Sequence, residues 1–121
     1  MHQGWMKEKT EKFLYVLKLI EDKYYIGQST DPKKRIRKQF RGSGSAWTKQ
    51  FPPIEVLLIE SIGSMDYKEA EAYENRMVLK YMKQFGWENV RGGFFTNVDC
   101  EIVYKNLLNH KSKGTFEIDF L

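Results

Sequence analysis

The sequence predicts a small domain of the α/β (α+β) class, in which a three-stranded sheet carries helices on its faces. Three observations lead to this prediction. Two short runs rich in β-forming residues follow one another near the start of the chain. A third apolar run follows a pair of prolines, and amphipathic segments with helix-capping residues lie between and after these runs. The expected order is strand, strand, helix, short helix, strand, helix, which buries its apolar faces as layers.

The first two strands are expected to form an antiparallel hairpin. Phe13 to Leu19 alternates in polarity and is rich in β-forming side chains, and Tyr24 to Gln28 has the same character. A turn is predicted at residues 21–22. The hairpin places Tyr15 and Tyr25 on adjacent strands, where they can be cross-strand neighbours.

Capping residues mark the helices that follow the hairpin. Asp31 is a favoured N-cap and Pro32 a favoured first helical residue, so a helix is predicted from there to about Phe40. A flexible glycine- and serine-rich break is expected at residues 42–45. A short helix over residues 46–51 is then ended by the two prolines that follow it.

The third strand and the longest helix complete the predicted domain. Ile54 to Ile62 is apolar at six of its nine positions, so we expect a central strand that is buried on both faces. The longest helix is predicted from Asp66 to Phe85, with Gly86 as its C-cap.

The main domain is predicted to have a segment on either side of it. Residues 1–12 are mostly polar and are expected to form an N-terminal arm, residues 13–93 the main domain, and residues 94–121 a C-terminal extension. The extension is expected to contain a helix over residues 98–109. The alternating residues 116–120 are typical of a strand or of an exposed docking peptide.

Composition limits the partners that the chain can have. Of its 121 residues, 41% are hydrophobic, which is enough for a real core, and the net charge of +4 is compatible with a polyanionic partner. No stretch approaches the roughly 20 apolar residues of a membrane span. The single cysteine excludes an internal disulfide and a cysteine-based zinc site. These features predict a cytoplasmic protein that does not interact with a membrane.

One carboxylate lies where an apolar side chain is expected. At about 100° per residue, Glu74 falls at the centre of the apolar stripe of the longest helix, among Ala70, Val78 and Tyr81. Burial of an unpaired carboxylate costs several kcal/mol unless a metal ion, an arginine or hydroxyl groups compensate it. A buried structural pair and a functional site are therefore both open interpretations.

The helix after the hairpin is strongly basic. Lys34, Arg37, Lys38 and Arg41 form a face that suits either solvent or the phosphates of a nucleic acid. Arg35 borders the apolar side of the same helix, so it is the candidate for an arginine that points inward.

The short helix adds two further candidates for contact with nucleic acid. Trp47 supplies an aromatic ring and Lys49 a cation, and both residue types bind the backbone of DNA. Trp47 is explained equally well as a core residue.

Taken together, these residues resemble the GIY-YIG nuclease family. Residues 13–15 occupy the position of the first triplet and keep only its tyrosine, while residues 25–27 match the second triplet in full. Arg35 occupies the position of the catalytic arginine, Glu74 that of the metal-binding glutamate, and Asn89 that of the asparagine that ends the motif.

The resemblance implies a three-stranded antiparallel sheet flanked by helices and a metal-dependent DNA endonuclease. The catalytic residues that it implies are Tyr15, Tyr25, Arg35, Glu74 and Asn89. Glu74 would bind one divalent cation, Mg²⁺ or Mn²⁺, and Arg35 would neutralise the charge of the phosphate. One of the two tyrosines would orient and deprotonate the attacking water, and Asn89 would hold the site by a hydrogen bond to a tyrosine or the phosphate.

One departure from the family pattern leaves a second interpretation open. Many members carry a histidine four residues after the arginine, where this chain has Gln39, which cannot act as an acid or a base. The alternative is a catalytically weak or inactive DNA-binding module. A third interpretation is an adaptor protein whose apolar end docks a partner. Specific cutting of DNA would need either a homodimer or an accessory protein.

Overall fold

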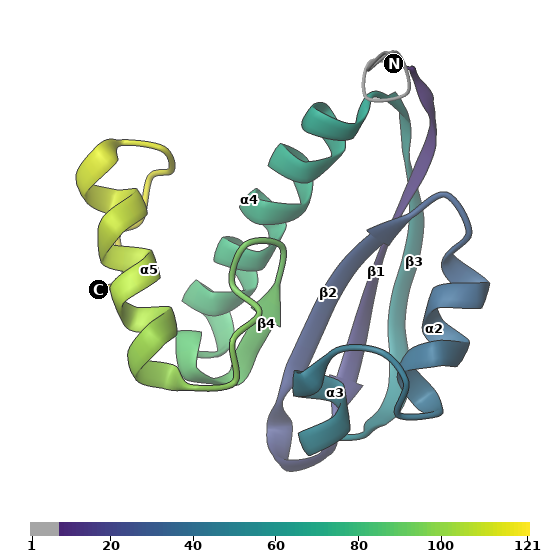
Figure 1. Ribbon diagram of the computed structural model, residues 1–121, viewed down its shortest axis with the longest axis horizontal. Helices are drawn as coiled ribbons and strands as arrows, with labels where there is room; N and C mark the ends of the chain where they lie inside the picture. Colours follow the sequence, from purple (N-terminus) through teal and green to yellow (C-terminus); the bar gives the residue numbers. More distant parts are fainter. Residues whose placement is uncertain (1–7) are drawn as a thin grey trace, which may run out of the picture.

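The computed structural model describes residues 8–121 and shows one sheet with helices on both of its faces (Figure 1). Short turns of 3₁₀ helix lie at Ile20–Asp22 and at Trp87–Asn89. The main elements are, in chain order, β1 (Thr10–Leu19), β2 (Tyr24–Ser29), α2 (Pro32–Phe40), α3 (Ala46–Gln50), β3 (Pro53–Met65), α4 (Tyr67–Phe85), β4 (Val90–Gly92) and α5 (Cys100–Lys113).

The sheet contains four strands in the order β3-β1-β2-β4. β1 pairs antiparallel with both β2 and β3, and β4 pairs parallel with β2. The mixed α+β class is confirmed, but the prediction of three antiparallel strands is wrong because it omitted β4. A strand of three residues, Val90–Gly92, is too short to show an alternation of polarity in the sequence.

β3 is an edge strand, so its predicted central position is also wrong. β1 occupies the centre instead, between β2 and β3. Ile54, Val56 and Ile59 of β3 are 57%, 38% and 44% exposed. A mostly apolar run indicates a strand, but its place in the sheet depends on which distant strands pair with it.

The alternation of β1 sends its side chains to two different cores. Leu14 and Val16 pack on the face that α4 covers, in a cluster that includes Val78. Tyr15 and Leu17 point to the opposite face and pack with residues of α2 and α3. Tyr15 and Tyr25 therefore lie on the α2 side of the sheet.

The C-terminal residues belong to the core on the α4 side. Val103 and Leu107 of α5 are fully buried there, in the same cluster as Val78 (Figure 1). The helix predicted over residues 98–109 is confirmed and is longer at its end, because Asp99 caps its start and the left-handed Gly114 its finish.

The end of the chain is neither a strand nor an exposed docking peptide, which corrects both expectations for residues 116–120. Ile118 is only 4% exposed, and Lys83 of α4 forms a 2.8 Å ion pair with Asp119. The alternation of polarity reflects an extended segment with one side against the core. At the other end, residues 10–12 of the predicted arm belong to β1, and residues 1–7 lie outside the described residues.

Candidate active site

Tyr15 and Tyr25 form the centre of the candidate site. In the register of the hairpin, Tyr15 lies opposite Gly27 and Tyr25 opposite Leu17, so the two tyrosines are diagonal neighbours. Their ring centroids are 6.3 Å apart and the rings are tilted by 42°. This arrangement confirms that the hairpin brings the two rings together.

Gly27 makes room for the ring of Tyr15. A Cβ atom at this position would overlap Cζ and the hydroxyl oxygen of Tyr15. The glycine therefore allows the phenol to lie directly over the neighbouring strand, as a glycine within a strand often does where another group approaches closely.

Arg35 and Gln39 of α2 both reach the hydroxyl of Tyr15. Arg35 forms a hydrogen bond with it, and Nε2 of Gln39 donates to it at 3.5 Å. Burial raises the pKa of Tyr15 above its usual value, and the two donors from α2 oppose this increase because they stabilise the phenolate.

Tyr25 has an environment that disfavours ionisation more strongly. Burial raises its pKa, and the nearby Tyr15 and Glu74 raise it further because a second negative charge would be close. Arg35 and a hydrogen bond from the hydroxyl of Ser45 act in the opposite direction. Tyr25 is therefore the more firmly protonated of the two phenols.

A cavity of about 320 Å³ opens beside the tyrosines. Its walls come from β2, from α2 and from the loop between α2 and α3. The lining residues are Tyr25, Arg35, Lys38, Gln39, Ser43, Gly44 and Ser45. Two cations, a phenol and the hydroxyls of serine residues suit the oxygen atoms of a phosphate group.

Glu74 approaches the site from α4. The pairing of β4 with β2 stops at Ile26, and beyond that point Glu74 accepts a hydrogen bond from the backbone N–H of Gln28. Burial raises the pKa of the Glu74 carboxyl to about 7, and the charge of Glu71 adds to this, whereas the Gln28 bond and Arg35 lower it. No lysine or arginine among residues 8–121 forms an ion pair with Glu74.

The buried stripe of α4 is centred on Asn75 rather than on Glu74, which corrects the sequence prediction. Asn75 is fully buried, whereas Glu74 lies half-buried at the border of the stripe. Oδ1 of Asn75 accepts the N–H of Phe94 at 2.8 Å, and Nδ2 donates to the carbonyl of Glu71 at 3.0 Å. The sequence correctly indicated a polar residue within the apolar stripe of this helix, but we assigned that place to Glu74 instead of Asn75.

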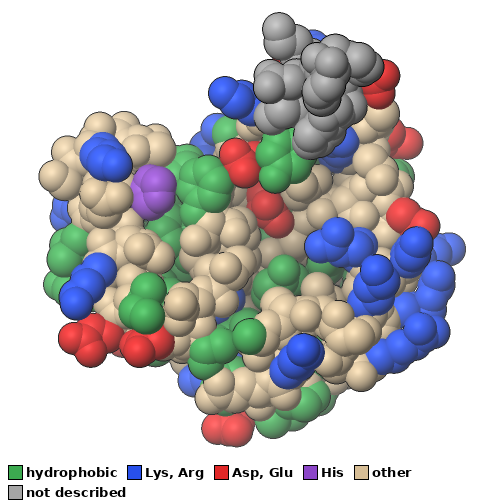
Figure 2. Space-filling model, viewed as in Figure 1, with side chains coloured by type: hydrophobic (Ala, Val, Ile, Leu, Met, Phe, Trp, Pro, Cys, Tyr) green, Lys and Arg blue, Asp and Glu red, His purple; other side chains and the backbone are tan. Residues whose placement is uncertain are grey.

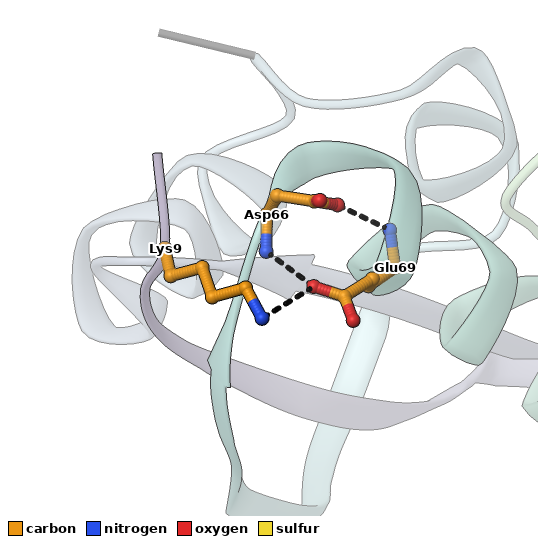
Figure 3. A network of polar contacts seen from close by, with 3 residues as sticks. All are labelled: Lys9, Asp66 and Glu69. Atoms are coloured by element: carbon orange, nitrogen blue, oxygen red, sulfur yellow. Dashed lines mark hydrogen bonds and ion pairs between the residues drawn. The ribbon is translucent and has the colours of Figure 1, made fainter. Parts of the chain in front are cut away.

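A capping box fixes the start of the helix that carries Glu74 (Figure 3). The Asp66 carboxylate accepts the N–H of Glu69 at 2.8 Å, and the Glu69 carboxylate accepts the N–H of Asp66 at 3.0 Å. Lys9 lies 3.8 Å from the same Glu69 oxygen. The predicted helix from Asp66 and its end at Gly86 are confirmed.

Asn89 lies among different partners from those expected. Its Oδ1 accepts a hydrogen bond from Nζ of Lys23 at 2.8 Å, and its Nδ2 donates to the carbonyl of Phe85 at 2.8 Å. These bonds close the C-terminal end of α4. Neither bond reaches a site tyrosine, so of the two expected partners of Asn89 only the phosphate stays a prediction.

Trp47 belongs to the core, so its predicted contact with nucleic acid is wrong. It is 2% exposed, and its indole N–H donates to the carbonyl of Tyr24 at 2.9 Å. A short helix with one apolar face must bury that face, and the ring of Trp47 fills the space between α3 and the sheet.

The basic residues predicted to contact nucleic acid are all exposed. Figure 2 shows lysine and arginine side chains gathered over the part of the surface where Figure 1 places α2. The exposed candidates are Lys34, Arg37, Lys38, Arg41 and Lys49.

The carboxylate oxygens of Glu74 are ligands that suit a hard divalent cation. Among residues 8–121, no three histidine, cysteine, aspartate or glutamate side chains come together. Glu74 would hold the ion with its half-buried carboxylate, which no cationic side chain pairs within the described part of the chain. A single carboxylate suits Mg²⁺ or Mn²⁺, because such an ion keeps most of its water ligands.

A family model described as the GIY-YIG catalytic domain matches residues 11–86, so the protein belongs to this family. Membership implies a nuclease-type function on nucleic acid that generally depends on a divalent metal ion. Within the described residues, no helix is long and apolar enough to cross a membrane.

Among known proteins, the chain is similar to the UPF0213 proteins of several bacteria. It is 30% identical over 74 residues to UPF0213 protein YazA of Bacillus subtilis, which covers 60% of this chain and 75% of that protein. It is also 30% identical over 81 residues to UPF0213 protein SAG0778 of Streptococcus agalactiae, covering 63% and 92% of the two chains. No solved structure matches.

Proposed function

We propose that the protein is a metal-dependent DNA endonuclease that hydrolyses phosphodiester bonds with one divalent cation. The observation that carries this proposal is that Tyr15, Tyr25, Arg35 and Glu74 come together from four separate segments of the chain. They meet beside a cavity whose lining includes Arg35 and Lys38. We place the activity in the cytoplasm, where double-strand cutting would require a homodimer, an accessory protein or two successive events.

The proposed reaction assigns a role to each of these side chains. Arg35 neutralises the charge that increases on the phosphate in the transition state. The phenolate of one tyrosine accepts the proton of the attacking water. At the same time the new O–P bond forms, and the bond from phosphorus to the leaving oxygen breaks. The leaving oxygen then takes a proton from solvent. A cation held by Glu74 would polarise a phosphate oxygen.

The direct test is incubation of supercoiled plasmid with the purified protein and Mg²⁺ or Mn²⁺. We expect conversion to nicked circles, no conversion with EDTA, and recovery when the cation is added in excess. The exposed basic residues of α2 should make DNA binding weaken steeply with added salt. Absence of nicking by protein that is folded and bound to the plasmid would contradict the endonuclease proposal.

That last outcome would favour the second candidate, a DNA-binding module without activity. The observation in its favour is Gln39, which stands where many family members have a histidine. Binding that is equal in Mg²⁺ and in EDTA, without any cutting, would support it.

Replacement of Tyr15 by phenylalanine tests the role of its hydroxyl. We expect Tyr15→Phe to reduce nicking by about 10²–10³-fold, because general-base catalysis contributes effects of this size. Folding should change little, since the buried ring remains and only the hydrogen bonds of its hydroxyl with Gln39 and Arg35 are lost. Circular dichroism and urea denaturation would check the fold, and Tyr67→Phe, at an exposed position, is the matched control. Equal rates for wild type and Tyr15→Phe would remove Tyr15 from the mechanism.

A further inference from the structure

Gln39 is a buried polar residue beside the site. It is one of the residues that line the 320 Å³ cavity, and it is only 2% exposed. A polar side chain buried to this degree is stable only if its hydrogen bonds are made. Every polar atom of the Gln39 amide has a partner in the structure.

The backbone decides which way the Gln39 amide points. The N–H of Ser45, which can only donate, lies 3.1 Å from one amide atom, so this atom must be the oxygen. The hydroxyl of Thr48 also donates to this oxygen, at 2.6 Å. A Cβ atom at Gly44 would overlap the amide, so the glycine leaves the space in which the amide lies.

With Oε1 held by Ser45 and Thr48, Nε2 can only present its hydrogen atoms to Tyr15. The Tyr15 oxygen lies 3.5 Å from Nε2, and Arg35 supplies it with another donor. This is a long contact, of the kind that shortens when a substrate closes the site. Two donors on one phenolic oxygen favour the phenolate, which has no proton of its own to give.

Tyr25 lacks an equivalent donor from α2. Its partner is the hydroxyl of Ser45, and Arg35 acts on it through its charge alone. The charge of Glu74 opposes ionisation of both tyrosines, so the difference between them is the pair of donors on Tyr15. The environments of the two tyrosines therefore differ, although their rings are neighbours.

We propose that Gln39 is a positioning residue that makes Tyr15, rather than Tyr25, the proton acceptor of the reaction. This inference rests on the proposed nuclease function. The proton of the attacking water moves to the oxygen of Tyr15 while the O–P bond forms, and the leaving oxygen is protonated by solvent. Gln39 neither gains nor loses a proton in this step. Glutamine in this position is thus a fixed donor, and its presence is compatible with cutting.

Two variants separate the donor from the packing of the side chain. Gln39→Glu keeps an oxygen for Ser45 and Thr48 but turns a second acceptor toward Tyr15. Gln39→Met keeps the length and loses all the hydrogen bonds. Gln50→Met, at an exposed position of α3, is the matched control.

Single-turnover nicking should fall about tenfold in Gln39→Met, as expected for the loss of one hydrogen bond to a charged group. It should fall further in Gln39→Glu, with the acidic limb of the pH–rate profile, which reports the proton acceptor, moved upward by about one pH unit. The affinity for DNA should change less than about twofold in each, because the donor acts on the proton transfer. Wild-type rates in Gln39→Glu would overturn the inference, because a structural anchor alone would then suffice.

A measurement without DNA distinguishes failure of this inference from failure of the nuclease function. In ¹⁵N spectra of the metal-free protein, the side-chain amide signals of Gln39 should shift in Tyr15→Phe and stay in place in Tyr25→Phe. If the Gln39 signals shift in Tyr15→Phe but the wild type never nicks DNA, the nuclease function is overturned and the hydrogen bond between Gln39 and Tyr15 is supported. If the Gln39 signals do not shift in Tyr15→Phe, the positioning role of Gln39 is overturned, even if the wild type cuts DNA.

Discussion

Glu74→Gln is expected to abolish metal-dependent nicking and, at the same time, to stabilise the metal-free protein. Loss of the carboxylate removes the ligand for the cation, which contributes several kcal/mol to the reaction, so the rate should fall by about 10³-fold or more. The carboxyl has a pKa raised to about 7, because its charged form is held in a half-buried position. An amide of the same shape avoids this cost.

The pH dependence follows from the direction of the shift. The folded protein binds the Glu74 proton up to about pH 7, whereas the unfolded chain releases it near the ordinary pKa of 4.5. Wild-type stability therefore decreases as pH rises through this window, relative to Glu74→Gln. Above pH 7 the variant should be more stable by about 1–2 kcal/mol, after allowance for partial exposure, and near pH 4 the two should be equal.

Urea denaturation of both proteins at pH 4 and pH 8, with and without MgCl₂, measures these differences. The cation should stabilise the wild type and leave Glu74→Gln unchanged, because only the wild type binds it tightly. Glu55→Gln, on the exposed edge strand, is the matched control for the loss of one charge. Nicking by Glu74→Gln at the wild-type rate would contradict the assignment of the cation to Glu74.

Arg91→Met is expected to have the largest effect on stability. Arg91 is fully buried, and its guanidinium donates to the carbonyls of Trp87, Val90 and Asn97 at 2.7–2.8 Å. It also lies 4.4 Å from the ring centroid of Trp47, so it connects β4 with α3. Burial lowers its pKa, and these acceptors replace the water that it has lost.

Replacement by methionine leaves three carbonyl groups without their donor. We expect a loss of about 3–5 kcal/mol in the free energy of unfolding, the size seen when one partner of a buried charged network is removed. Arg91→Lys should lose less, because it keeps a charge but not the planar fork. Urea denaturation measures all three proteins, and Arg37→Met on the exposed face of α2 is the control. A loss below about 1 kcal/mol would show that water replaces the guanidinium.

Much of the local structure could be predicted because its causes lie within a few residues. Asp31 and Pro32 begin α2, Asp66 begins α4 and Gly86 ends it, as the sequence indicated. The predicted hairpin correctly placed Tyr15 and Tyr25 on adjacent strands, where their rings are neighbours. A cap needs only the neighbouring backbone groups, so its signal is complete in the sequence.

The errors concern residues whose neighbours are distant in the chain. β3 was expected in the centre of the sheet and lies at its edge, and β4 was missed. Trp47 was a candidate both for contact with nucleic acid and for the core, and the structure buries it. The hydrophobicity of a residue indicates that it can be buried, but the pairing of strands and the packing of helices decide whether it is.

For the site itself, the sequence alone determined which residue types are present and that Tyr15, Arg35 and Glu74 match a nuclease pattern. Only the tertiary structure decided what each of them touches. Gln39 shows the difference: its amide could point either way, and the N–H of Ser45 together with the hydroxyl of Thr48 makes it a donor to Tyr15. A hydrogen bond needs two partners at a defined distance and angle, and folding alone brings such partners together.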